Sequence, residues 1–257
     1  MRTAAILPVK RFAGAKSRLG ASVADPLRTD LARAMVGDVL TALGEATGLE
    51  RTIVVTGEDS VAKAAAYLGA LVVNDAAEAG QSAAVSLGVQ AALTAGFERV
   101  VCIPGDCPAL DPTEIDELLG PARTDAQGPE VTIVPDRHGT GTNALVLTPP
   151  GTIVPSFGPD SCERHRELAD RSGVSCRVER PASLLLDIDT GEDLDALRER
   201  LAAERLRAPR TRAVLGASAS GASANLPSER AAWTPDEPSS TSTDEPSAVK
   251  PSPLGAR

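Results

Sequence analysis

Short apolar runs alternate with longer amphipathic segments through the first half of the chain. Buried strands are expected at residues 4–9, 51–55, 71–73 and 100–103, where apolar residues follow one another. Helices are expected between them, from about Pro26, at 59–68 and at 81–95, and another opens at Asp111, a cap followed by proline. Strands that alternate with helices in this way predict a mainly parallel sheet with right-handed crossovers.

The second half of the chain is more mixed. Two strands, 131–134 and 144–147, flank a polar turn, which suggests an antiparallel excursion of the sheet. A helix is expected from just after Asp160 to Arg171, a last strand at 184–188, and a final helix opened by a capping box at Thr190–Asp193. The pattern predicts an α/β three-layer sandwich with a mainly parallel, Rossmann-like sheet.

Composition divides the chain into a domain, residues 1–207, and a tail, residues 208–257. The tail is rich in Ser, Pro, Ala and Thr without a sustained apolar period, so it is expected to be disordered. It carries equal numbers of acidic and basic residues, so the formal charge of −9 belongs to the domain. A net acidic domain without a basic stripe argues against nucleic-acid binding.

The remaining composition bears on location and on metal chemistry. No apolar run has the length of a membrane span, and the first residues lead into a strand without a signal-peptide pattern. The four cysteines lack paired CxxC spacing, which favours a reducing cytoplasm. With two histidines in the chain, a zinc site is not expected.

The segment 100–110, VVCIPGDCPAL, carries the strongest chemical signal. A β-branched run stops at Gly105-Asp106, and Pro108 keeps the strand from continuing. Asp106 is therefore expected at the carboxyl end of a parallel strand, where open α/β sheets bind ligands. A carboxylate there suits a hard cation such as Mg²⁺, although Asp106 could instead only cap the turn.

A cationic loop follows the first strand and should reach the same edge of the sheet. Lys10, Arg11, Lys16 and Arg18 could meet a polyphosphate there, and small residues 13–15 would let the backbone approach it. The loop is neither a Walker motif nor GxGxxG, and such cations are often only a solvated face.

Three further places could contribute to a site. Asp187 and Asp189 alternate along the expected last strand, so both carboxylates would point the same way and could share a cation with Asp106. Asp189 could instead only cap the following helix. The turns at 139–143, at 158–161 and at Gly80-Gln81-Ser82 offer hydroxyls and backbone N–H groups, or are plain turn chemistry.

The residues lack the usual arrangements for nucleophilic catalysis. We find no Ser-His-Asp order, no cysteine in an activating setting and no histidine at a convincing acid–base position. Clustered cations, carboxylates and helix starts instead suit phosphoryl or nucleotidyl transfer, which depends on positioning and charge stabilisation.

Five motifs in order resemble the phosphoenolpyruvate/2-phospho-L-lactate guanylyltransferases of coenzyme F(420) biosynthesis. The motifs are ILPVKRFAGAKSRL, VCIPGDCPALD, PDRHGTGTNAL, FGPDS and LLLDIDTGEDL, and the resemblance covers residues 1–205. It implies a nucleotide-diphospho-sugar transferase fold. It also implies site residues: Lys10, Lys16 and Arg18 at the GTP phosphates; Gly80, Gln81 and Ser82 at the base; Asp106 with Asp187 or Asp189 at Mg²⁺; and Thr142, Gly158 and Ser161 at the three-carbon acid.

The resemblance implies a reaction in which the acid's phosphate attacks the α-phosphorus of GTP and pyrophosphate leaves. The chain departs from many relatives at Gln81-Ser82, where they carry Leu-Asn. A downstream transferase that takes over the product is an implied partner. The alternatives are another nucleotidyltransferase, acting on a molybdopterin or a sugar phosphate, and a non-catalytic GTP-binding regulatory protein.

Overall fold

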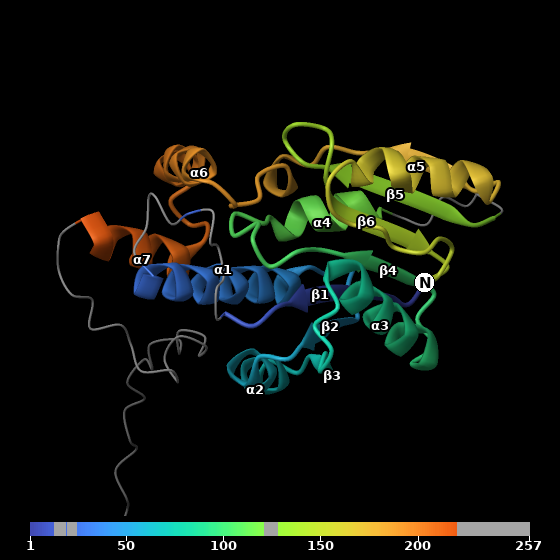
Figure 1. Cartoon of the computed structure of the whole chain (residues 1–257), viewed down its shortest axis with the longest axis horizontal. Coiled ribbons are helices and arrows are strands. Elements are labelled where there is room, and N and C mark those ends of the chain that lie inside the picture. Colours follow the sequence, from blue (N-terminus) through green and yellow to red (C-terminus); the bar gives the residue numbers. More distant parts are fainter. Residues whose placement is uncertain (13–18, 20–24, 121–127, 220–257) are drawn as a thin grey trace, which may run out of the picture.

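The computed structural model describes residues 1–12, 19, 25–120 and 128–219, and within them seven strands form one sheet (Figure 1). The order across the sheet is β3-β2-β1-β4-β6-β5-β7. The strands are β1 Thr3–Val9, β2 Arg51–Thr56, β3 Leu71–Asn74, β4 Arg99–Cys102, β5 Glu130–Pro135, β6 Thr142–Thr148 and β7 Ser175–Val178. The helices are α1 Asp25–Glu45, α2 Asp59–Tyr67, α3 Gln81–Thr94, α4 Pro112–Leu119, α5 Ser161–Arg171, α6 Gly191–Ala203 and α7 Pro209–Ala219.

The central strands run in parallel, as the alternation of elements predicts. Strand β1 lies between β2 and β4, with Ile6 opposite both Ile53 and Cys102. Strand β6 runs antiparallel between β4 and β5, which confirms the expected antiparallel excursion. Because β1 and β4 are adjacent and parallel, the residues that follow them emerge at the same edge of the sheet.

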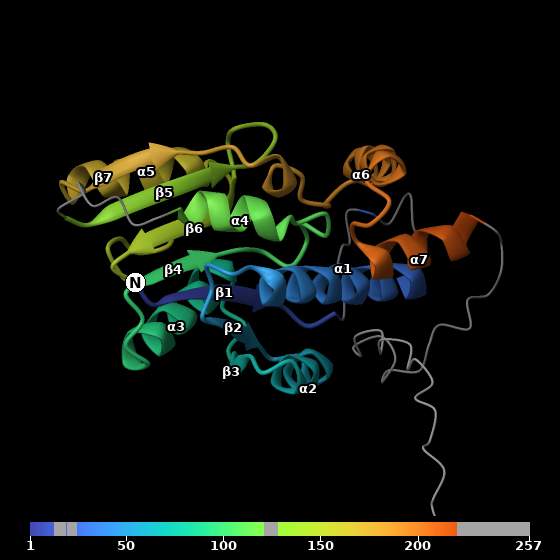
Figure 2. The same cartoon turned by 180° about the vertical axis from the view of Figure 1, so that it is seen from behind.

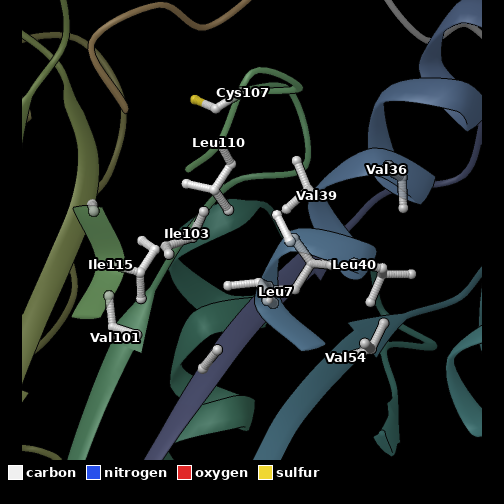
Figure 3. Packing of buried hydrophobic residues seen from close by; sticks show 14 of the residues in the cluster. Leu7, Val36, Val39, Leu40, Val54, Val101, Ile103, Cys107, Leu110 and Ile115 are labelled. Carbon is white, nitrogen blue, oxygen red and sulfur yellow. The ribbon is translucent and has the colours of Figure 1, made fainter. Parts of the chain in front are cut away.

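Alternate side chains of the strands face two separate helical layers. Ala5 and Leu7 belong to a first core cluster with residues of α1, α2 and α4, and Figure 3 shows the part of it around Leu7. Ala4 and Ile6 belong to a second core cluster with residues of α3 and α5. On the second face a Cβ added to Gly88 of α3 would lie 2.4 Å from Ile6 Cγ2, so the helix can approach β1 only with glycine there. These contacts confirm the three-layer sandwich. No helix of the described ranges is both long and apolar enough to cross a membrane.

The C-terminal helix α7 corrects the predicted domain boundary. It packs along α1, as both views show (Figures 1 and 2), and its Val214, with Ala208 just before the helix, is buried in a third core cluster. The buried Asp38 carboxylate of α1 accepts hydrogen bonds from the backbone N–H groups of Arg210 (3.1 Å) and Thr211 (2.8 Å). The prediction of a disordered tail is therefore wrong for Pro209–Ala219, and residues 220–257 lie outside the described ranges.

The predicted last strand at 184–188 is also wrong. Ala182–Leu184 form a 3₁₀ turn, and the residues after it pair with no strand of the described sheet. The apolar run is buried in another way, because Leu184 enters the first core cluster and Ile188 the third. The seventh strand is instead β7, a short, partly polar edge strand parallel to β5, which the sequence pattern missed.

Candidate active site

The cationic loop and Asp106 leave the same edge of the sheet from neighbouring strands. Lys10 is exposed directly after β1, and Arg11 Nε lies 3.0 Å from Glu78 Oε1 in an exposed ion pair. Leu19, at the far end of the loop, is buried in the third core cluster. The predicted phosphate ligands Lys16 and Arg18 lie outside the described residues.

The turn that carries Asp106 is shaped by its contact with α1. Ile103 N still donates to Ile6 O at 3.0 Å, so pairing with β1 continues one residue past β4. A Cβ added to Gly105 would then lie 2.9 Å from Val36 Cγ2 of α1. The glycine therefore lets α1 lie against the turn, which places the half-buried Asp106 at the predicted edge.

The segment that contains Asp187 and Asp189 lies directly against Asp106. Ile188 N donates to Asp106 O at 3.0 Å, although neither residue belongs to a strand. Burial raises the pKa of the Asp187 carboxyl, and so do the negative charges of Asp106 and, more weakly, Asp189. The three predicted carboxylates are thus neighbours, held together by a loop–loop contact and not by a strand.

Asn143 is a site residue that the sequence analysis did not select. Its buried side chain donates from Nδ2 to Leu184 O (2.8 Å) and to Asp187 Oδ1 (3.2 Å). The second bond favours the charged form of Asp187 and opposes the increase in its pKa. Asn143 therefore orients one predicted metal ligand.

Asp106 and Asp187 form a candidate cation site. Among the described residues, no three His, Cys, Asp or Glu side chains are arranged as a metal-binding group. Mg²⁺ commonly uses one or two carboxylates and completes its shell with water and phosphate oxygens. Asp106 and Asp187 meet that smaller requirement, since their mutual repulsion raises the pKa of Asp187 and a divalent cation would relieve it.

A capping box and one arginine hold the Asp187–Asp189 segment from the other side. Asp193 Oδ2 accepts hydrogen bonds from Asp189 N (3.1 Å), Thr190 N (2.7 Å) and Thr190 Oγ1 (2.8 Å). Asp193 Oδ1 lies 2.8 Å from Nη2 of Arg137 in the β5–β6 turn. The predicted capping box of α6 is confirmed, and it also fixes the backbone of Asp189.

The residues predicted to bind the acid also meet in space. Ser161 Oγ donates to Thr142 Oγ1 at 3.1 Å, and Ser161 N donates to Gly158 O at 3.1 Å. Gly158 has a φ of +114°, which L residues rarely adopt, so the turn into α5 requires glycine at this point. Thr142 and Ser161 are both buried, so their hydroxyls lie together, shielded from solvent, at the start of β6 and α5.

A β-bulge decides which way Thr142 and Asn143 face. The register of β5 and β6 shifts between Val134 and Pro135, so that Pro135 lies opposite Thr142. Leu145 belongs to the α3–α5 side of the sheet, and simple alternation would place Asn143 there as well. The bulge reverses this order, since Thr142 contacts α5 while Asn143 reaches Leu184 and Asp187.

The predicted nucleotide-binding residues lie at the start of α3, next to the turn that contains Gly158. Gly80 has a φ of +105° and precedes the helix, and Gln81 and Ser82 form its first turn. Ser82 Oγ accepts a hydrogen bond from Phe157 N at 2.8 Å, one residue before Gly158. The residues expected at the base of the nucleotide and those expected at the acid are therefore directly joined.

His165 is the second site residue that the sequence analysis missed. It is fully buried on α5, with Nδ1 3.1 Å from Thr142 Oγ1 and with Nε2 accepting from Ser156 N at 2.9 Å. Burial, and then the charge of Arg164, lower the pKa of His165 to about 4. One signal was available in the sequence, because His165 follows Ser161 by four residues and so shares its helix face.

The buried imidazole predicts a pH-dependent loss of stability. The pKa of His165 is about 4 in the folded protein and 6.5 in its reference state, so the unfolded chain binds the proton more readily. The free energy of unfolding should therefore fall as the pH drops from about 6.5 to 4, by about 3 kcal/mol from this group, with no further loss below.

Urea unfolding of the wild type and of His165→Asn between pH 4 and pH 8 isolates this component, because the carboxylates titrate in both proteins. The wild-type curve should be the steeper one below pH 6.5. Parallel pH profiles for the two proteins would contradict the prediction.

Comparison with known proteins identifies the family of this chain. Residues 3–199 match the family model "Guanylyl transferase CofC like". The chain belongs to this family. The resemblance found in the motifs is thereby confirmed, and the protein is a nucleotidyltransferase. Helix α7 lies beyond the matched residues.

Two curated relatives differ in the acid that their names specify. The phosphoenolpyruvate guanylyltransferase of Conexibacter woesei is 49% identical over 203 residues, which cover 79% of this chain and 90% of the relative. The 3-phospho-D-glycerate guanylyltransferase of Phenylobacterium zucineum is 38% identical over 192 residues, which cover 74% of this chain and 86% of the relative. The guanylyl group is common to both names.

Solved structures support the fold. A chain from Desulfovibrio desulfuricans G20, assigned as a nucleotide-diphospho-sugar transferase, superposes with a TM-score of 0.66 at 20% identity and covers 86% of this chain and 96% of its own. The predicted nucleotide-diphospho-sugar transferase type of fold is confirmed.

Proposed function

We propose that the protein transfers the guanylyl group of GTP to phosphoenolpyruvate, or to 2-phospho-L-lactate, and releases pyrophosphate. The observation that carries this proposal is the hydrogen bond from Ile188 N to Asp106 O, which brings Asp187 beside Asp106. Asn143, the neighbour of Thr142 in β6, is in turn hydrogen-bonded to Asp187. A cation held by these two carboxylates, close to the hydroxyls of Thr142 and Ser161, would stabilise the charge of anionic substrates. Phosphoenolpyruvate is preferred because the 49% identical relative is named for it.

The proposed reaction needs no protein nucleophile. An oxygen of the acid's phosphate would form a bond to the α-phosphorus of GTP, while the bond from that phosphorus to the β-phosphate oxygen breaks. A phosphate monoester is largely ionised at pH 7, so the attacking oxygen needs no general base. This agrees with the buried, neutral state of His165, which is unsuited to proton transfer with the substrate.

The chain's own residues would bind and orient the two substrates. Lys10, with Lys16 and Arg18, would neutralise the triphosphate, and Asp106 with Asp187 would hold Mg²⁺, with Asp189 as the further candidate. The ion would supply charge stabilisation at the phosphates. Thr142, Gly158 and Ser161 would hold the acid, and Gly80, Gln81 and Ser82 the base.

The test is pyrophosphate release from GTP and Mg²⁺ with phosphoenolpyruvate, 2-phospho-L-lactate and 3-phospho-D-glycerate supplied separately. We expect turnover with phosphoenolpyruvate, coupled where the product is labile to the next transferase and its deazaflavin acceptor. Turnover with 3-phospho-D-glycerate instead would show that this acid, and not phosphoenolpyruvate, is the acceptor substrate. No turnover with any of the three, with GTP bound, would overturn the proposal and favour a different acceptor or a regulatory GTP-binding role.

The proposal extends to the pathway, the downstream partner and the cellular location of the protein. A role in coenzyme F(420) biosynthesis would require a downstream transferase that accepts the guanylylated product, and direct transfer between the two would protect it. None of the four cysteines forms a disulfide bond, which fits a cytoplasmic location. Coupled assays with and without the partner would show whether the product passes through solution.

A further inference from the structure

The buried imidazole of His165 connects two parts of the proposed acid pocket. Its Nε2 accepts from the backbone N–H of Ser156, in the loop that leads to Gly158. Its Nδ1 lies 3.1 Å from Thr142 Oγ1, at the start of β6. The ring also meets Phe157 edge to face, with centroids 5.2 Å apart. A side chain so enclosed has its orientation set by these partners.

The partners determine where the imidazole carries its proton. A backbone N–H can only donate, so Nε2 must present its lone pair to Ser156. A neutral ring that accepts at Nε2 carries its hydrogen on Nδ1, and this hydrogen then points to Thr142 Oγ1. The lowered pKa of His165 agrees with a neutral ring.

The imidazole in turn determines the role of the Thr142 hydroxyl. Thr142 Oγ1 accepts one hydrogen bond from His165 and a second from Ser161 Oγ. A hydroxyl has two acceptor sites and one donor, so both acceptor sites are occupied. The hydrogen of Thr142 is left to donate to a third group, which suits a carboxylate or phosphate oxygen.

We propose that His165 is a positioning residue that makes Thr142 a hydrogen-bond donor to the anionic acid substrate. This inference rests on the proposed function, since it assigns an orientation within the pocket for that acid. His165 itself does not touch the substrate. Its effect should appear in the binding of the acid, and little in the binding of GTP or in turnover.

Two substitutions separate this role from simple packing. The side-chain amide of His165→Asn reaches the position of Nδ1 and can donate to Thr142, but it cannot reach Ser156. The amide of His165→Gln reaches the position of Nε2 and can accept from Ser156, but it leaves Thr142 without its donor. Each variant loses one hydrogen bond of the buried ring, so both should lose similar stability.

The expected result is a split between the two variants in the KM for the acid. His165→Gln should raise this KM about tenfold, equivalent to about 1.4 kcal/mol, with kcat and the KM for GTP within about twofold of the wild type. His165→Asn should keep the KM for the acid within about twofold. Equal increases in both variants, or no increase in His165→Gln, would overturn the proposal.

A second measurement observes the imidazole of His165 directly and leaves that residue unsubstituted. The chain has two histidines, and His138 is exposed, so ¹⁵N labelling of His138→Gln leaves one imidazole signal. Nitrogen shifts at pH 7 should report a neutral ring protonated on Nδ1. A ring protonated on Nε2 would overturn the proposal.

The failure of this inference can be distinguished from the failure of the proposed function. If the wild type transfers the guanylyl group to none of the acids, the proposed function fails and the inference fails with it. If the wild type turns over and His165→Gln has the wild-type KM for the acid, only the inference is overturned.

Discussion

Asp106→Asn should lower kcat/KM for guanylyl transfer about a thousandfold or more while the protein remains folded. The two side chains are nearly the same size, but asparagine cannot supply the negative charge proposed to hold Mg²⁺. Loss of a metal-centred stabilisation of about 4 kcal/mol corresponds to this factor. Stability should not fall, because the charge of Asp106 raises the pKa of Asp187 and its removal relieves that repulsion.

The measurements are steady-state pyrophosphate release and thermal unfolding with and without Mg²⁺. The matched control is Asp170→Asn, at an exposed position near the end of α5. This substitution should leave the rate of pyrophosphate release and the melting temperature unchanged. Mg²⁺ with GTP should raise the melting temperature of the wild type more than that of Asp106→Asn, because a ligand stabilises only the state that binds it. Near-wild-type activity would remove Asp106 from the proposed cation site.

Truncation after Leu206 should both destabilise the protein and reduce its activity. It removes α7, whose Val214 lies in the same core cluster as Leu31 and Met35 of α1, and it leaves the Asp38 carboxylate without its N–H donors. Exposure of these apolar side chains alone costs on the order of 3–5 kcal/mol. Ile188, between Asp187 and Asp189, belongs to the same core cluster, so the loss should extend to the site.

The control is truncation after Ala219, which keeps α7 and removes only residues 220–257. Urea unfolding should show the full decrease in the free energy of unfolding for the chain that ends at Leu206, and little decrease for the chain that ends at Ala219. The kcat of the shorter chain, measured where it is still folded, should fall at least tenfold, because Asp187 and Asp189 then lose part of their support. Wild-type stability and kinetics for the shorter chain would show that α7 is dispensable, as a plain spacer would be.

The places in the fold of several candidate residues could be predicted because they depend on local signals and one general rule. Asp106 follows a β-branched run and a glycine, and the carboxyl ends of parallel strands share one edge of a sheet. The glycine turn before α5 likewise indicated Gly158 and Ser161 as a helix start. The structure brings Ser161 to Thr142, as the motif resemblance implies.

Other features could not be predicted because they depend on contacts between distant segments. The run at 184–188 looks like a strand, yet Leu184 and Ile188 are buried in two different clusters and no strand pairs with them. Helix α7 has little apolar periodicity of its own, and it forms against α1 with Asp38 as its cap. Neither partner is visible in the local sequence.

The sequence by itself determined the order of strands and helices as far as α5, the capping box of α6 and the edge of the sheet where chemistry could occur. These follow from periodicity and capping, which act within a few residues. Only the tertiary structure decided which groups meet there. The bulge at Val134/Pro135 turns Thr142 toward His165 and Asn143 toward Asp187, and a loop contact sets Ile188 on Asp106. Such pairings arise when packed layers bring distant segments together, and no local pattern encodes them.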